Sequence, residues 1–124
     1  MIAVDTSVLM DWLDQVDRPE TRRVDQFAQS GDGVLAAVTV TELLSDPRGA
    51  RSLDATLVAF PVLPISDGYW ERAGRLRAAV LKARRKAALG DALIAQACID
   101  NSVPLLSRDG DFAAFVKAGG LKLA

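Results

Sequence analysis

Residues 103–112 read VPLLSRDGDF, an apolar run that ends in two aspartates, Asp109 and Asp111. Residues 1–9, MIAVDTSVL, have the same form, because a short apolar run leads directly into Asp5. A short and continuously apolar run is typical of a strand that is buried on both faces of a parallel sheet. Both stretches therefore predict a buried strand that presents a carboxylate at its carboxyl end.

Similar runs recur along the chain, and helical patterns separate them. The predicted strands are residues 2–5, 33–37, 61–65, 103–107 and a terminal 120–123. The predicted helices are residues 5–16, 19–30, 39–46, 48–59, 66–86 and 91–101. Alternating strands and helices indicate an open α/β fold, in which helices cover both faces of a parallel sheet.

The composition is that of an ordinary globular protein, and we expect one domain over residues 1–124. Half of the residues are hydrophobic, and 15 basic residues nearly balance 16 acidic ones, so no strong net field favours nucleic acid or a membrane. Histidine is absent. Its absence excludes Ser-His-Asp triads, histidine-based ribonuclease chemistry and most catalytic zinc sites. Any hydrolysis by this chain must use carboxylates, metal ions or both.

The single cysteine, Cys98, cannot form an internal disulfide, so a reducing compartment and a cytoplasmic location are expected. Cys98 lies in an apolar stretch and is expected to be a buried core residue. No secretory signal is expected, because Asp5 interrupts the first apolar stretch. The longest apolar stretch, residues 55–65, is too short and too proline-rich to span a bilayer.

Four carboxylates occupy equivalent places at strand ends and helix starts: Asp5, Glu42, Asp91 and Asp109. Sites in open α/β sheets form beyond the carboxyl ends of the strands, so these side chains are expected to share one edge of the sheet. Close carboxylates repel one another, and a divalent cation relieves that repulsion. Oxygen ligands without histidine select Mg²⁺ or Mn²⁺, which activate water for attack on a phosphodiester.

Each of these acids also has a structural explanation, which is favoured when the acid is considered alone. The stretch from Thr39 to Glu42 has the form of a capping box, with Glu42 in the first turn of its helix. Asp91 and Asp109 are common types of helix-start residue. Asp5 is harder to explain in this way, because a charge at the end of a buried strand costs free energy unless something compensates it.

Four motifs, in this order and at this spacing, resemble those of PIN-domain ribonucleases, specifically the VapC-type toxins of bacterial toxin–antitoxin pairs. They are VDTSVLMDWL (4–13), TVTELL (39–44), LGDALIAQA (89–97) and LLSRDGDF (105–112), and the resemblance covers essentially the whole chain. It implies a three-layer α/β/α sandwich with a short parallel sheet, and metal-dependent hydrolysis of RNA by water. It also implies a homodimer and a cognate antitoxin whose tail covers the site.

The resemblance assigns roles to individual residues. The catalytic carboxylates that hold Mg²⁺ or Mn²⁺ would be Asp5, Glu42, Asp91 and Asp109. Thr6 or Ser7 would hydrogen-bond these carboxylates, and Ser107 would orient Asp109, although helix capping explains the three hydroxyls equally well. Asp111 lies beyond the pattern Ser107-Arg108-Asp109 that matches the family's last aspartate, and it is expected to have a secondary or structural role.

Seven of the 15 basic residues lie between Arg72 and Lys86, with no acid among them. Such a cluster is usually a solvated helix face, but in a nuclease it would contact phosphates. The candidates for RNA contact are Arg75, Lys82, Arg85, Lys86 and Arg108. Trp12 and Trp70 are expected to pack in the core or against a partner rather than on bases.

Other functions are consistent with parts of the sequence. A housekeeping RNA-processing nuclease of the same family is one, although the compact length favours the toxin. A catalytically silent binding module would lack a site acid, and none is missing. A dehalogenase-type phosphotransferase needs an aspartate where Ser7 stands, and a receiver domain needs a lysine where Arg108 stands.

Overall fold

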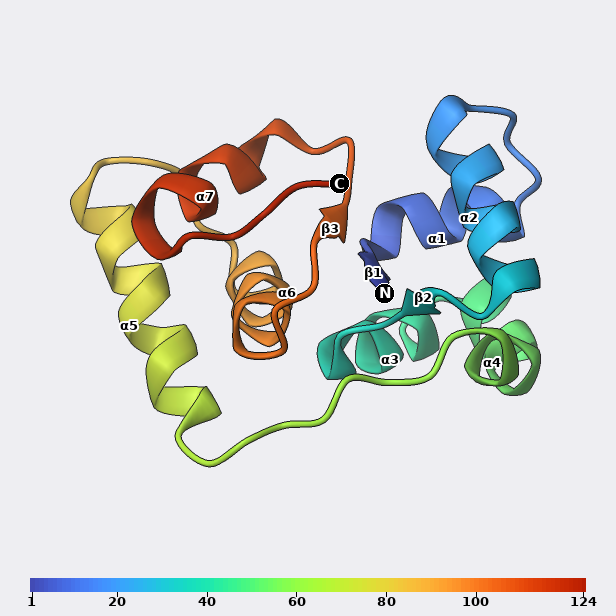
Figure 1. The fold of residues 1–124 in the computed structure, drawn as a ribbon, viewed down its shortest axis with the longest axis horizontal. Coiled ribbons are helices and arrows are strands. Elements are labelled where there is room, and N and C mark those ends of the chain that lie inside the picture. The colour runs from blue at the N-terminus through green and yellow to red at the C-terminus, as the bar shows by residue number, and fades with distance from the viewer.

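The computed structural model describes residues 1–124 and has a short parallel sheet between two groups of helices (Figure 1). The strands are β1 (Ile2–Val4), β2 (Gly33–Val34) and β3 (Leu105–Leu106). They lie in the order β2-β1-β3, and β1 pairs in parallel with both neighbours. The predicted α/β fold with a parallel sheet is therefore confirmed.

The helices cover both faces of this sheet. They are α1 (Thr6–Leu13), α2 (Pro19–Ser30), α3 (Ala37–Leu44), α4 (Pro47–Ala59), α5 (Tyr69–Lys82), α6 (Leu89–Asp100), the short 3₁₀ helix η1 (Gly110–Phe112) and α7 (Ala113–Gly119). In Figure 1, α5, α6 and α7 lie on one side of the sheet, and α1, α2 and α4 lie on the other. Helix α3 packs against both α4 and α6 and so joins the two sides.

Successive strand residues alternate between two hydrophobic cores, as the two-residue period of a strand requires. The core with α5, α6 and α7 contains the strand residues Ala3, Val34 and Leu105, and the core with α1, α2 and α4 contains the strand residues Val4 and Leu106 and the bridge residue Leu35. Each fully buried valine or leucine contributes about 1.5–3 kcal/mol. Because both faces are buried, the strands are apolar throughout, and Cys98 is buried in the first of these cores, as expected.

Two predicted strands are reduced to single bridges. Residues 61–65 form only the parallel bridge between Leu35 and Val62, and residues 120–123 form only the bridge between Leu105 and Leu123. The stretch 61–65 contains two prolines, which have no N–H to donate to a neighbouring strand. The prediction of full strands at these two places was therefore wrong.

Helix boundaries also differ from the predicted ones. The predicted helix 66–86 is α5, which begins after Gly68 in the left-handed conformation (φ 81°) and is followed by Arg84 in the same conformation (φ 60°). Lys86 therefore lies beyond the helix and not on its face. Helix α7 was not predicted, although Ala114 and Phe115 give it a buried side.

Gly49 lies where the start of α4 packs tightly against the backbone of α3. A Cβ atom at this position would lie 2.4 Å from the backbone oxygen of Leu43, so Gly49→Ala is expected to destabilise the protein by about 1–3 kcal/mol. Gly74→Ala is the matched control, because a Cβ there meets nothing within 4 Å and alanine favours the helix by about 0.5–1 kcal/mol. Chemical denaturation measures both changes, and two changes of the same sign would contradict this packing.

No helix combines the length and the apolar composition that a membrane-spanning segment needs.

Candidate active site

The strand order brings two of the predicted acids to one edge of the sheet. Asp5 follows β1 and Ser107 follows β3, and the pairing of Val4 with Leu106 sets these next residues side by side. The backbone N–H of Asp5 donates to the carbonyl of Leu106 at 3.0 Å. Asp109 comes two residues after Ser107, so the carboxyl ends of the two neighbouring strands deliver two carboxylates to the same place.

Asp5 is a buried carboxylate, with 5% of its surface exposed. Its Oδ2 atom accepts hydrogen bonds from Ser107 Oγ at 2.7 Å and from Ser7 Oγ at 3.0 Å. Burial raises the pKa of Asp5 above its ordinary value, and these hydrogen bonds act in the opposite direction. The carboxylate does not cap α1 with a side-chain hydrogen bond. A capping role therefore does not account for Asp5.

Ser107 connects Asp5 to Asp109. Its Oγ donates to Asp5 Oδ2 and accepts the backbone N–H of Asp109 at 3.0 Å. Asp109 in turn accepts the backbone N–H of Asp111 at 2.9 Å and so caps η1. The capping alternative is correct for Asp109, but one carboxylate serves both as a cap and as a member of the acidic cluster.

Glu42 does not belong to a capping box, and that interpretation was wrong. Helix α3 begins at Ala37, two residues earlier than predicted, and Glu42 therefore lies in its second turn. Glu42 Oε1 accepts a hydrogen bond from Thr6 Oγ1 at 2.7 Å. Its Oε2 atom faces the start of α6, where a Cβ on Gly90 would lie 3.4 Å away. Glu42 is thus held toward the residue that precedes Asp91.

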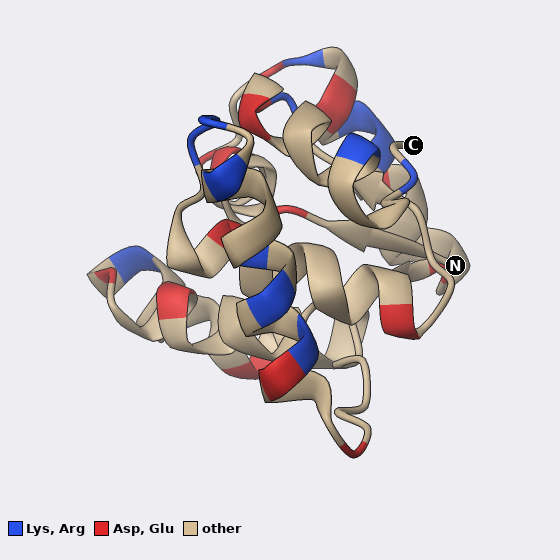
Figure 2. Ribbon diagram, turned by 90° about the vertical axis from the view of Figure 1, so that its left-hand side faces the viewer, with Lys and Arg blue, Asp and Glu red and all other residues tan.

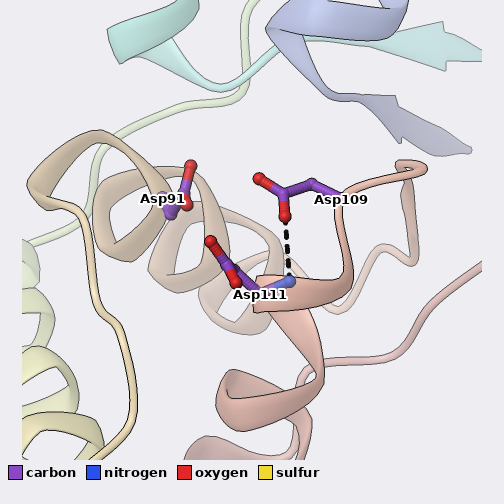
Figure 3. A group of neighbouring side chains, drawn as sticks. All are labelled: Asp91, Asp109 and Asp111. Atoms are coloured by element: carbon purple, nitrogen blue, oxygen red, sulfur yellow. Dashed lines mark hydrogen bonds between the residues drawn. The ribbon is translucent and has the colours of Figure 1, made fainter.

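Asp91 from α6 and Asp111 from η1 lie close to Asp109, which precedes η1 (Figure 3). Asp91, Asp109 and Asp111 each offer a carboxylate oxygen within 4.8 Å of the others. The sequence motif had given Asp111 a secondary role, whereas the structure places it with Asp91 and Asp109. The sequence signal for Asp111 was its position two residues after Asp109, but the turn at η1 that brings it close to Asp91 was not predicted.

The carboxylates share one electrostatic environment. The pKa of Asp91 is raised to about 6, mainly because the side chain is partly buried. Repulsion adds to this effect, and the charges responsible are Asp5, Asp109, Glu42 and Asp111, in decreasing order. The site therefore stores like-charge repulsion that a bound cation would relieve.

Metal-free protein is expected to melt at a higher temperature at pH about 5 than at pH about 8. A carboxyl whose pKa is raised in the folded state favours folding when protonated, and this contribution is lost as the pH rises through about 6 for Asp91. The partly exposed position limits the effect to roughly 1 kcal/mol. Asp91→Asn should flatten the profile in EDTA. An equally steep profile in that variant would contradict the assignment.

The donor set fits a hard divalent cation. Only carboxylate oxygens converge at the cluster, and the one cysteine of the chain is buried in the hydrophobic core. Carboxylate oxygens without imidazole or thiolate suit Mg²⁺ or Mn²⁺ rather than zinc or copper. The residues that would hold such an ion are Asp91, Asp109 and Asp111, with Asp5 and Glu42 beside them.

Two of the five predicted RNA-contacting residues lie in ion pairs near the acids. Lys86 Nζ lies 3.4 Å from Asp111 Oδ2, and Arg108 pairs with Asp11. The other three are exposed and have no carboxylate partner: Arg75, Lys82 and Arg85. Figure 2 shows that Lys and Arg recur along α5. Lys86 is thus the basic residue that the structure ties most directly to the cluster.

The two tryptophans lie in different environments. Trp12 packs edge-on against the buried Phe60 with ring centroids 5.5 Å apart, as expected of a residue at the border of the core. Trp70 is 62% exposed and so does not pack in the core, whereas packing against a partner stays a prediction. The largest surface hollow, about 430 Å³, lies beside Trp12 between α1 and α2 and contains none of the clustered acids.

Comparisons with known proteins agree with this architecture. The chain is similar in fold to VapBC2 from Rickettsia felis bound to a promoter DNA fragment (TM-score 0.76, 16% identity, 100% of this chain and 98% of that one). It is also similar to FitAcB from Neisseria gonorrhoeae (TM-score 0.74, 22% identity, 99% and 96%). VapBC-1 from nontypeable Haemophilus influenzae gives a TM-score of 0.75 at 16% identity, with 100% and 97% covered.

A search of curated protein sequences found no match. The family model described as the PIN domain matches residues 2–118, which include all of the clustered carboxylates. The chain is therefore a member of the PIN-domain family.

Proposed function

We propose that this protein is a metal-dependent endoribonuclease that hydrolyses RNA phosphodiester bonds. The observation that carries the proposal is the convergence of carboxylates from β1, α3, α6 and η1 at one end of the parallel sheet. PIN-family membership and the absence of histidine support the same chemistry. A Mg²⁺ or Mn²⁺ ion held there would activate water and stabilise charge on the phosphate.

The residues of this chain would prepare the site for that reaction. Ser7 and Ser107 hold Asp5 in one orientation, and Thr6 holds Glu42. Asp91, Asp109 and Asp111 provide the oxygen ligands. Lys86, which pairs with Asp111, and Arg108, which precedes Asp109 and pairs with Asp11, would contact backbone phosphates of the RNA near the cut.

We also propose that the protein acts in the cytoplasm as the toxin of a toxin–antitoxin pair. The support is the shared fold with chains from VapBC and FitAB structures, and with a chain from a toxin–antitoxin complex of Klebsiella pneumoniae. A cognate antitoxin would then be a partner, and its tail would cover the acidic site. A homodimer is proposed as well. The exposed Trp70 and the 45% exposed Ile65 supply apolar surface for association.

An RNA cleavage assay tests the proposed reaction. Purified protein should cut structured RNA in Mg²⁺ or Mn²⁺ and not in EDTA. Water is the proposed nucleophile, so the products should lack 2′,3′-cyclic phosphates, and blocking the 2′-hydroxyl at the cut should not prevent cleavage. Cleavage in EDTA, or products that carry a cyclic phosphate, would overturn the metal-dependent mechanism.

Lys86→Ala is expected to weaken RNA binding and to reduce its dependence on salt. Removing one phosphate contact lowers the slope of log K against log salt by about 0.7 for single-stranded RNA. The slope should be measured in an Asp5→Asn background, which leaves the RNA intact. Lys122→Ala is the matched control, because this exposed lysine has no ion pair with the acids. Equal slopes for the two variants would mean that Lys86 forms only its ion pair with Asp111 and does not contact the RNA.

A further inference from the structure

Thr39 has a buried hydroxyl that neither helix capping nor the proposed metal site explains. The residue lies inside α3 and is 0% exposed. The capping box that its sequence position suggested is absent, because α3 begins at Ala37 with Ala36 as its N-cap. A buried hydroxyl requires a hydrogen-bond partner, and the partner of Thr39 Oγ1 is Thr6 Oγ1, 3.1 Å away.

The number of available protons fixes the direction of this hydrogen bond. Thr6 Oγ1 also lies 2.7 Å from Glu42 Oε1, and an ionised carboxylate can only accept. Thr6 has one hydroxyl proton, which must therefore go to Glu42. The bond between the two threonines must then be donated by Thr39. The result is a chain of two hydroxyls that runs from Thr39 through Thr6 to Glu42.

This chain fixes how Glu42 presents its two oxygens. Oε1 is occupied by Thr6, whereas Oε2 faces Gly90 at the start of α6, next to Asp91. Thr6 is only partly buried, so without Thr39 its hydroxyl could rotate toward water. A donor from Thr39 polarises the Thr6 hydroxyl and keeps its proton directed at the carboxylate.

We propose that Thr39 is a positioning residue that acts through Thr6 to orient Glu42 toward the cation site. The consequence for hydrolysis rests on the proposed nuclease function, whereas the relay itself is a property of the fold. Removing a group that hydrogen-bonds a metal-binding side chain typically weakens metal binding by about 10–100-fold. Thr39 reaches Glu42 only through Thr6, so we expect an effect at the lower end of this range. Thr39→Val is therefore expected to weaken Mn²⁺ binding about 10-fold.

The first experiment measures Mn²⁺ affinity by titration calorimetry, without RNA. Thr39→Val removes the hydroxyl and keeps the branched shape, and Thr39→Ser should restore affinity to within about twofold of the wild type. Thr41→Val is the matched control, because Thr41 is exposed on the same helix, and it should bind Mn²⁺ as the wild type does. Thr6→Val combined with Thr39→Val should be no weaker than Thr6→Val alone. If the losses of Mn²⁺ affinity in the two single variants multiply in the double variant, Thr39 does not act through Thr6.

A second experiment tests the relay without any metal. In EDTA, the melting temperature should fall when Thr39→Val is made in the wild type, and should change less when it is made in Thr6→Val, where Thr39 has already lost its acceptor. Equal changes in the two backgrounds would overturn the proposal. A wild type that binds no Mn²⁺ would refute the proposed metal chemistry, and the EDTA comparison would still decide the role of Thr39.

Discussion

Replacing Asp5 by asparagine is expected to lower the rate of RNA cleavage by at least 10²–10³-fold while the fold remains intact. This is the order of loss found when one preorganised charge-stabilising group is removed from an active site. Asparagine keeps the shape of Asp5, and the hydroxyls of Ser7 and Ser107 can rotate to suit the amide. The variant removes a buried carboxyl group whose pKa is raised by burial. Its metal-free stability should therefore equal or exceed that of the wild type.

The measurement compares cleavage rates and melting temperatures of the wild type, Asp5→Asn and Asp54→Asn. Asp54→Asn is the control, because it makes the same chemical change at an exposed residue of α4 that is not one of the clustered acids. A structural cap at Asp5 would give the opposite result, a loss of about 1 kcal/mol in stability with cleavage preserved. That outcome would remove Asp5 from the proposed active site.

The second large effect is stabilisation by metal. A ligand that binds only the folded state stabilises it by about 2.7 kcal/mol at a concentration 100 times its dissociation constant. Mn²⁺ or Mg²⁺ should therefore raise the melting temperature of the wild type by several degrees in comparison with EDTA. The effect should be larger at pH about 8 than at pH about 5, because protons compete for the Asp91 carboxylate, whose pKa is about 6.

Asp91→Asn should abolish this metal-induced shift. The substitution removes a ligand and also the repulsion that the ion relieves, so the metal-free variant should be at least as stable as the metal-free wild type. Asp54→Asn should show the full shift. If millimolar metal shifts neither the wild type nor the control, the clustered acids do not form a cation site. A catalytically silent binding module would then be the better description of the chain.

The sequence predicted the parts of the structure that depend on local pattern. An apolar run that ends in an acid predicted β1 with Asp5, and the same pattern predicted β3 with Asp109 nearby. The alternation of strands and helices predicted a sheet covered on both faces. These features follow from burial, which every residue of a short strand shares, and they can therefore be read without knowledge of the tertiary fold.

Features that depend on tertiary contacts were not predictable. The Thr39–Glu42 spacing matches a capping box, but α3 begins earlier, and Thr39 uses its hydroxyl for a contact 33 residues away. Asp111 joins Asp91 only because η1 turns back toward α6. The prolines of residues 61–65 reduced a predicted strand to one bridge, since apolar character cannot replace a missing N–H donor.

The pairing of β1 with β3 has a consequence for synthesis of the chain. Asp5 emerges from the ribosome before the other clustered acids, whereas its hydrogen-bond donor Ser107 and its neighbours Asp109 and Asp111 emerge last of the cluster. Because β1 and β3 are so distant in sequence, their contact forms only after a long loop has closed. A nascent chain therefore carries an incomplete set of carboxylates until residue 111 has been released. The proposed active site is therefore complete only after the ribosome has translated every residue from Asp5 to Asp111.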